Sequence, residues 1–297
     1  MKVFLVLVSL FAGLLARADI KIVAAENFYG GVAKEIGGDE VTVTSILTNP
    51  NQDPHEFTSD AATAKTVADA DIVIYNGLGY DGWMDKLLGV GGKKGRVVIR
   101  VADLIGVKDG ENPHIWYWPS TMPLLAQKLW LNLEKSLPEE SQGPVLKRLQ
   151  AFLEAMKPVF HETTVLKSKY EGTTVTATEP VFGYMAHALG FKMLNYDFQV
   201  SIMNDTEPSA TQTAAFEKSL NPKTVRILFY NKQVTDPTTE RLKKLAIAAD
   251  VPIVGVTETQ PADAKTYADW MMNELHAVEA ALKYPAGSYP AQLFDTP

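Results

Sequence analysis

Two histidines and two glutamates from separate stretches of the chain have side chains suited to bind a metal ion: His55, His114, Glu179 and Glu258. Each stands in a loop that follows or lies near an apolar, β-branched run, where open α/β sheets place their ligands. Two imidazoles and two carboxylates supply nitrogen and oxygen ligands whose charge neutralises one divalent transition metal. No thiolate can take part, because the chain has no cysteine.

The two histidines occupy similar local sequences, since each directly follows a proline that stiffens its loop. A rigid loop suits a ligand because a metal ion fixes the positions of its donors closely. Taken singly, His55 could instead be a surface histidine held by its turn. His114 could be a core histidine beside the aromatic run Trp116-Tyr117-Trp118. Two independent Pro-His loops favour the interpretation as ligands.

The two glutamates each follow a predicted strand and precede a predicted helix. Glu179 stands directly before Pro180, and Glu258 lies between Thr257 and Thr259. A carboxylate in such a place is also typical of a helix cap or of a charge that stabilises a helix N-terminus, so these structural roles stay open. The remaining histidines lie in predicted helices and are expected not to be ligands: His161, His187 and His276.

The beginning of the sequence has the pattern of a secretory signal peptide. Lys2 precedes an apolar run from Val3 to Leu15, and Ala16-Arg17-Ala18 is a small-x-small cleavage site. The run is shorter than the roughly 20 residues of a membrane-spanning helix. We therefore expect residues 1–18 to be removed, which leaves a soluble exported protein without a membrane anchor. Lipid attachment at the cleavage site is not expected, because no cysteine follows it. An uncleaved anchor is the alternative.

The charge of the chain limits its partners. The formal net charge is −7, and loss of Lys2 and Arg17 with the signal peptide makes it still more negative. Nucleic-acid binding needs clustered lysine and arginine to meet phosphates, and no such cluster is present. The composition favours a cation or another protein as the partner and excludes nucleic acid.

Strand-like and helix-like segments alternate through the chain, which predicts an α/β fold of two lobes, each with a mostly parallel sheet covered by helices. The predicted strands are Ile20 to Ala24, Val41 to Leu47, Asp71 to Tyr75, Arg96 to Val101, Thr173 to Ala177, Val225 to Tyr230 and Pro252 to Val256. The predicted helices are Asn27 to Ile36, Ser59 to Asp69, Pro180 to Leu189, Thr211 to Leu220, Thr238 to Ala249 and Ala262 to Leu282.

A long helix is predicted to join the lobes. Apolar residues recur every three or four positions from Val145 to Phe160, after a helix start near Glu139. This gives an N-terminal lobe of residues 19–136, a linking helix of residues 137–170 and a C-terminal lobe of residues 171–297. Pro158 should kink the helix because it removes one intrahelical hydrogen bond; two shorter helices broken there are the alternative.

Five separated motifs, in order, resemble those of the solute-binding proteins of bacterial ABC importers for zinc, manganese or iron. They are Asn27-Phe28-Tyr29 with Ile36-Gly37-Gly38-Asp39, Asp53-Pro54-His55-Glu56-Phe57, Ala70-Asp71 through Tyr75-Asn76-Gly77-Leu78, Asn112-Pro113-His114-Ile115-Trp116, and Phe182-Gly183-Tyr184. The resemblance implies two α/β lobes bridged by a long helix, with one metal ion between them. It places the four ligands at His55, His114, Glu179 and Glu258.

The sequence departs from the usual family pattern at three places. Glu179 stands where zinc receptors usually have histidine, Trp118-Pro119 replaces a more usual Asp-Pro, and Glu258 replaces a commoner aspartate. These departures leave the metal and the fourth ligand open, with Asp205 and Glu207 as competitors for that ligand. Two carboxylates favour Mn²⁺ or Fe²⁺ slightly, although the intrinsic order of affinities favours Zn²⁺.

We therefore expect a periplasmic, monomeric protein that captures one divalent metal (Mn, Fe or Zn) and delivers it to an inner-membrane ABC permease, and that is not an enzyme. An exported metal-dependent hydrolase is the alternative. A hydrolase keeps an open coordination position for water beside a general base, whereas here all four candidates are needed as ligands. An adhesin has been described among relatives, but no residue supports that role.

Overall fold

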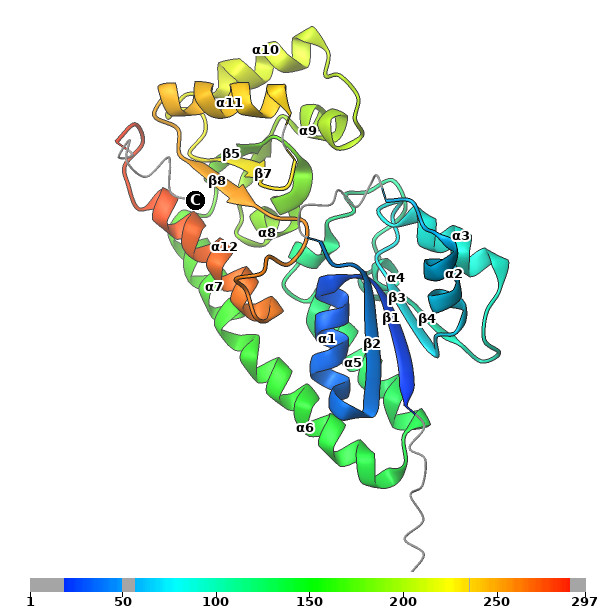
Figure 1. Ribbon diagram of the computed structural model, residues 1–297. Coiled ribbons are helices and arrows are strands. Elements are labelled where there is room, and N and C mark those ends of the chain that lie inside the picture. The colour runs from blue at the N-terminus through cyan, green and yellow to red at the C-terminus, as the bar shows by residue number, and fades with distance from the viewer. Residues whose placement is uncertain (1–18, 50–56, 235, 289–297) are drawn as a thin grey trace, which may run out of the picture.

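The computed structural model describes residues 19–49, 57–234 and 236–288, which form two α/β lobes (Figure 1). Each lobe has a four-stranded sheet whose strands are all parallel. The predicted fold class is thereby confirmed. His55 and the predicted signal peptide lie outside the described residues.

The sheet of the N-terminal lobe has the order β2-β1-β3-β4. Its strands are β1 Ile20–Glu26, β2 Val41–Leu47, β3 Ile72–Tyr75 and β4 Val97–Arg100. Successive side chains of β1 point to opposite faces of the sheet, as the pleat of a strand requires. Ile22 and Ala24 join the core that contains α1 and α5, whereas Val23 and Ala25 join the core that contains residues of α2 and α3. A strand buried on both faces explains why its sequence is almost continuously apolar.

The helices of this lobe cover both faces of the sheet (Figure 1). They are α1 Asn27–Gly37, α2 Ala61–Ala68, α3 Gly82–Val90, α4 Val101–Ile105 and α5 Thr121–Ser136, with short 3₁₀ turns η1 Gly38–Glu40 and η2 Ile115–Tyr117. The sequence predicted α1 and α2 within two residues. It did not predict α3, α4 or α5, although Leu125, Leu129 and Leu133 of α5 are buried at helical spacing.

The sheet of the C-terminal lobe has the corresponding order β6-β5-β7-β8. Its strands are β5 Thr174–Ala177, β6 Lys192–Leu194, β7 Leu228–Asn231 and β8 Ile253–Val256. The sequence missed β6, a three-residue strand at the edge of the sheet. The predicted strand from Val225 begins three residues later, because the backbone N–H of Val225 bonds to Asn221 in a turn.

The C-terminal lobe contains η3 Pro180–Phe182, α8 Gly183–Ala188, α9 Tyr196–Met203, α10 Ala210–Ser219, α11 Pro237–Ala248 and α12 Tyr267–Leu282. The predicted helix from Ala262 starts only at Tyr267, because Thr266 caps it. The predicted helix from Pro180 is divided into η3 and α8. No prediction covered α9.

The predicted linking segment is present as α6 Glu139–Ala155 and α7 Lys157–Tyr170. The two helices meet at Met156, two residues before Pro158, which has no N–H to offer the carbonyl of Glu154. Met156 keeps a right-handed helical conformation, with φ −77° and ψ −16°, so the chain continues along nearly the same line. Figure 1 shows the two helices as one long rod beside both lobes.

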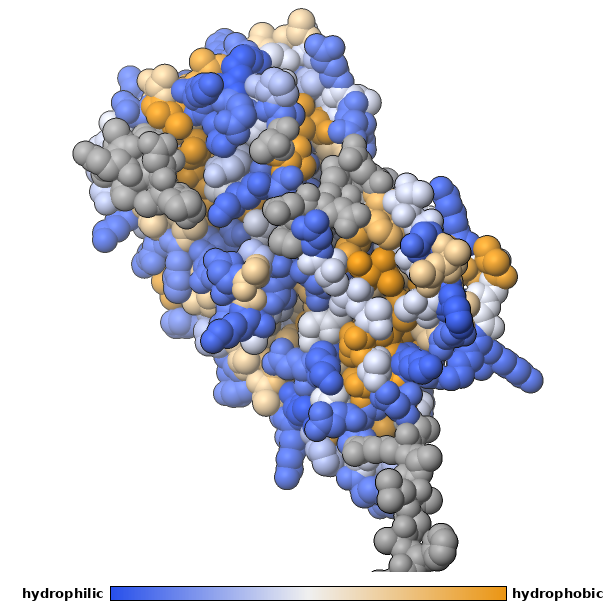
Figure 2. Space-filling view, viewed as in Figure 1, coloured by the Kyte–Doolittle hydropathy of each residue, from blue (hydrophilic) through white to orange (hydrophobic). Residues whose placement is uncertain are grey.

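The surface drawn in Figure 2 is mostly hydrophilic, with hydrophobic side chains gathered in smaller areas over both lobes. Within the described ranges, none of the helices has the length and apolar character to cross a membrane.

Candidate metal site

His114 lies in the loop before η2, and its side chain is fully buried. Its Nδ1 lies 2.7 Å from Oδ1 of Asn112, and its backbone N–H donates to the same oxygen. The orientation of the Asn112 amide is fixed, because its Nδ2 donates to the carbonyl of Pro180 at 2.7 Å. Oδ1 can then only accept, so in the neutral imidazole Nδ1 of His114 carries the proton and the lone pair is on Nε2. This tautomer suits a metal ligand.

The neighbours of Asn112 come from both lobes. Tyr184 of α8 donates its hydroxyl hydrogen to the Asn112 carbonyl at 2.8 Å. A Cβ on Gly183 would lie 2.8 Å from Asn112 Nδ2, so this close approach requires glycine. In the N-terminal lobe, Nδ2 of Asn76 donates to the carbonyl of Pro113. The loop that carries His114 is therefore fixed at several points.

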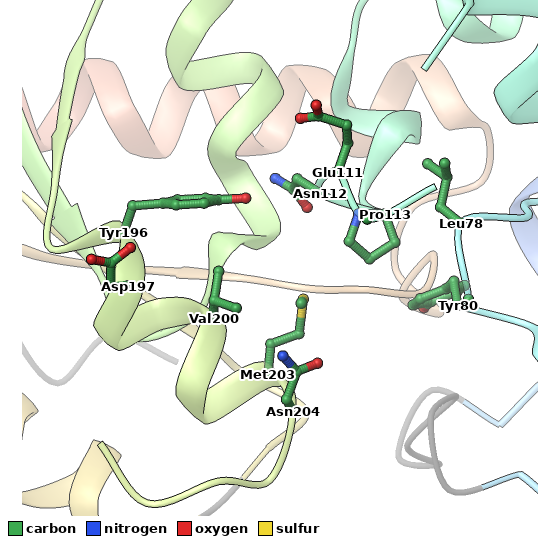
Figure 3. A pocket seen from close by; sticks show the side chains of 12 residues that line it. Leu78, Tyr80, Glu111, Asn112, Pro113, Tyr196, Asp197, Val200, Met203 and Asn204 are labelled. Atoms are coloured by element: carbon green, nitrogen blue, oxygen red, sulfur yellow. The ribbon is translucent and has the colours of Figure 1, made fainter. Parts of the chain in front are cut away.

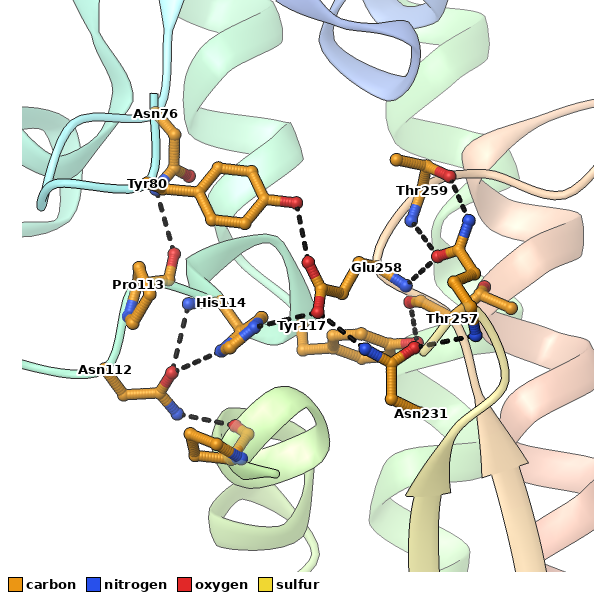
Figure 4. A network of polar contacts seen from close by, with 12 residues as sticks. Asn76, Tyr80, Asn112, Pro113, His114, Tyr117, Asn231, Thr257, Glu258 and Thr259 are labelled. Carbon is orange, nitrogen blue, oxygen red and sulfur yellow. Dashed lines mark hydrogen bonds and ion pairs between the residues drawn. The ribbon is translucent and has the colours of Figure 1, made fainter. Parts of the chain in front are cut away.

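Glu258 lies two residues after the end of β8 and is also buried. Its Oε1 accepts a hydrogen bond from Asn231 Nδ2 at 2.6 Å, and its Oε2 accepts one from the Tyr80 hydroxyl at 3.1 Å (Figure 4). Burial and the adjacent carboxylate of Glu258 raise the pKa of Tyr80, so the hydroxyl stays protonated and donates. Gln233 accepts the backbone N–H of Glu258. These bonds fix the carboxylate from both lobes.

The two predicted ligands meet across the lobes: His114 Nε2 lies 3.8 Å from Glu258 Oε1. Two ligands bonded at about 2.1 Å to one metal lie at most about 4.2 Å apart, so this separation fits a shared metal ion. Figure 4 shows His114 and Glu258 directed toward each other, with Tyr80 on the other side of the carboxylate. The geometry therefore supports an imidazole and a carboxylate as a joint donor pair.

The other candidate ligands among the described residues are Glu179, Asp205 and Glu207. Glu179 is buried between β5 and η3, next to the Pro180 whose carbonyl binds Asn112. The described part of the chain does not include His55, and it holds no group of three His, Asp or Glu side chains suited to bind a metal. The role of Glu179 as a ligand stays a prediction. Asp205 and Glu207 are exposed on the segment after α9, whereas Glu258 faces His114.

Two buried acids of the N-terminal lobe, Glu26 and Asp81, lie close enough to Tyr80 to act on its hydroxyl. Burial raises the pKa of Asp81 to about 6, although Asp81 accepts the backbone N–H groups of Asn76 and Gly77. Burial, and then the charge of Asp81, raises the pKa of Glu26 well above its ordinary value. Burial and the neighbouring Asp81 therefore favour the neutral form of Glu26 at the end of β1.

A cleft between the lobes leads toward the site. It has a volume of about 470 Å³, and it is bounded by loops of the N-terminal lobe and by α9. Figure 3 shows Val200 and Met203 of α9, and Asn204 just after it, opposite Pro113 and Leu78. Tyr80, which binds Glu258, and Asn112, which binds His114, both line the cleft, so it offers a path from solvent.

Comparison with known proteins identifies the family. A family model described as "Zinc-uptake complex component A periplasmic" matches residues 22–281. The chain belongs to this family. Its members are metal-binding, extracytoplasmic solute-binding proteins of ABC importers and are not enzymes, which decides against the exported hydrolase.

Several curated relatives are named as metal-binding proteins. A putative metal-binding protein of Thermotoga maritima is 26% identical, over 65% of this chain and 69% of the relative. The zinc-binding protein AdcA of Streptococcus pyogenes is 21% identical and matches 89% of this chain, but the match spans only 56% of AdcA. The manganese-binding lipoprotein MntA of Bacillus subtilis is 21% identical over 76% of this chain and 75% of its own.

Solved structures have the same fold. The periplasmic zinc-binding protein TroA of Treponema pallidum superposes with a TM-score of 0.72 at 20% identity, covering 89% of this chain and 99% of TroA. A Mn-bound periplasmic metal-binding protein from Candidatus Liberibacter asiaticus gives a TM-score of 0.69 at 19% identity, covering 88% of this chain and 98% of its own. At these identities the structures establish the shared fold.

Proposed function

We propose that this protein binds one divalent transition metal ion between its lobes in the periplasm and delivers it to the permease of an ABC importer. The observation that carries the proposal is the buried pair of His114 Nε2 and Glu258 Oε1, 3.8 Å apart and contributed by different lobes. We propose His55 and Glu179 as the ligands that complete the set. Membership of the family supports the importer as the destination.

The metal is proposed to be Mn²⁺, Fe²⁺ or Zn²⁺. Two imidazoles and two carboxylates suit Mn²⁺ and Fe²⁺, whereas the intrinsic order of affinities places Zn²⁺ above both. Names of relatives include zinc-binding and manganese-binding proteins. We favour Mn²⁺ or Fe²⁺ slightly, because Glu179 takes the place of a softer nitrogen ligand.

Release of the metal is proposed to follow a small separation of the lobes. A metal that binds His114 and Glu258 cross-links the two lobes, and a small increase in their distance breaks this link. The α6–α7 rod contacts both halves and should limit the movement. The protein is proposed to act as a monomer without a membrane anchor.

Thermal unfolding with and without metal tests the proposal. Metal at about 100 times its dissociation constant should raise the free energy of unfolding by roughly 2.7 kcal/mol. The His114→Ala variant should lose this increase, and His276→Ala, which removes an exposed histidine on α12, should keep it. Elemental analysis of both variants provides the second measurement. A wild-type protein that shows no stabilisation by Mn²⁺, Fe²⁺ or Zn²⁺ would refute metal capture.

A further inference from the structure

A second concave site lies where the two lobes meet, beside the interlobe cleft. This aromatic groove has a volume of about 300 Å³ and is lined by Trp118, Tyr184, His187, Tyr196, Glu111 and Gln199, together with Asn112, Gly183 and Met193. It shares Glu111, Asn112 and Tyr196 with the cleft. The metal site does not use its aromatic side chains.

The aromatic rings form the walls of the groove. The ring of Trp118 lies 5.3 Å from that of Tyr184 and 6.0 Å from that of His187, measured between centroids. Trp118 is 37% exposed and Tyr196 is 45% exposed, which is high for such large side chains. Figure 3 shows Tyr196 extending from α9 toward Asn112 and Glu111. Exposed π-faces beside a carboxylate attract cations.

The polar atoms of the groove are suited to bind hydrogen-bond donors. Gln199 is fully buried, and its Nε2 donates to the carbonyl of Leu194 at 2.6 Å. Its Oε1 has no hydrogen-bond partner among the described residues. The carboxylate of Glu111 can only accept. None of the described residues that line the groove is lysine or arginine. A ligand that matches these atoms carries positive charge and several N–H groups.

We propose that the aromatic groove binds the guanidinium group of an arginine side chain presented by the permease. A guanidinium stacks flat on aromatic rings while its five N–H donors reach acceptors in its plane, which an ammonium group cannot do. The acidic chain complements a basic partner. The choice of the permease as partner rests on the proposed function. Tyr184 and Asn112 connect the groove to His114, so the arginine would bind next to the residue that holds a metal ligand.

A blocked amino acid tests the chemistry without the permease. N-acetyl-arginine methylamide should shift the indole NMR signal of Trp118 in a saturable way, and the neutral isostere N-acetyl-citrulline methylamide should bind about tenfold more weakly or worse. Glu111→Gln and Trp118→Leu should each weaken arginine binding by about tenfold. Matched changes at an exposed acid and an exposed aromatic elsewhere, Glu140→Gln and Phe160→Leu, should have no effect. Equal binding of arginine and citrulline, or no saturation, overturns the proposal.

Two further measurements separate this proposal from metal capture. The metal affinity of Trp118→Leu and Glu111→Gln should equal that of the wild type, while metal transfer to permease-containing vesicles should fall about tenfold. Unchanged transfer would overturn the permease as the source of the arginine. Loss of metal affinity in either variant would overturn the assignment of the groove as a separate site. A wild-type protein that binds no metal would refute the proposed function, and the arginine titration would still decide the chemistry of the groove.

Discussion

Asn112 determines which nitrogen of His114 can meet a cation. Its Oδ1 takes the Nδ1 proton, and its Nδ2 is tied to the carbonyl of Pro180 in the other lobe. The Asn112 amide therefore selects the tautomer of His114 and connects this proposed ligand to the junction of the lobes. The carboxylate of Glu258 is held in a similar way by Asn231, whose own Oδ1 accepts the backbone N–H of Gln233.

Replacing Asn112 with leucine should lower metal affinity by about 10- to 100-fold, because His114 loses the acceptor that fixes its ring. Isothermal titration with Mn²⁺ and Zn²⁺ measures the change. Asn132→Leu on α5, whose amide donates to the Lys128 carbonyl of the same helix, serves as the control. Unaltered affinity in Asn112→Leu would show that the ring is held by other contacts.

Glu274 of α12 should make stability depend on pH. Burial raises its pKa to about 8, while Trp270 and Tyr117 lie within hydrogen-bonding distance of its Oε1. Between about pH 4.5 and pH 8 the folded protein keeps a proton that the unfolded chain has lost. The free energy of unfolding then falls as pH rises, by up to about 1.4 kcal/mol per pH unit, and levels off above pH 8.

Urea unfolding at several pH values tests this dependence. Glu274→Gln keeps the shape of the side chain without the proton, so its stability relative to the wild type should increase steadily from pH 5 to pH 8. Glu140→Gln, at an exposed carboxyl on α6, should follow the wild type. Parallel pH profiles for Glu274→Gln and the wild type would contradict the prediction.

At the scale of elements, the sequence was most informative where local rules decide the structure. The β-branched runs of β1, β2 and β3 and the helix α1 were predicted to within two residues at each end. The edge strand β6 was missed because Lys192-Met193-Leu194 has no β-branched residue and pairs with β5 only through the tertiary fold. His114 and Glu258 were predicted from their loops, but their partners Asn112, Asn231 and Tyr80 were not, since only long-range contacts reveal them.

The predicted start of α12 at Ala262 was wrong because a capping box of Thr266 and Asp269 sets the first turn of the helix. Thr266 accepts the backbone N–H of Asp269, and Asp269 accepts that of Thr266. Thr266→Ala should reduce the free energy of unfolding by about 1 kcal/mol, and Thr266→Ser should retain most of it. Denaturant unfolding at constant pH measures both. Equal losses in the two variants would mean that the hydroxyl does not cap the helix.

At the scale of the whole molecule, the two lobes share one apolar core. Trp116 and Tyr117 of the N-terminal lobe pack with Phe182 and Trp270 of the C-terminal lobe in one cluster. The Tyr267 hydroxyl donates to the Trp116 carbonyl, and Asn27 exchanges hydrogen bonds with Gln260. Neither lobe can unfold without exposing this junction to water.

Thermal unfolding should therefore be a single cooperative transition, although two-lobed proteins often show two. Calorimetric and van't Hoff enthalpies should agree, and saturating metal should move the one transition upward without splitting it. Two resolved peaks in differential scanning calorimetry would show that the lobes unfold independently.

The strand orders of the two sheets match, so the two lobes have the same sheet topology. Asn76 follows β3 and Asn231 ends β7, the third strand of each lobe in sequence, and each amide donates to the segment that bears its own lobe's proposed ligand. In the proposed site, each half thus contributes part of the coordination sphere together with the support for it. A chain severed between α6 and α7 would yield two fragments of like topology, and the cation would add to the apolar junction in holding them together.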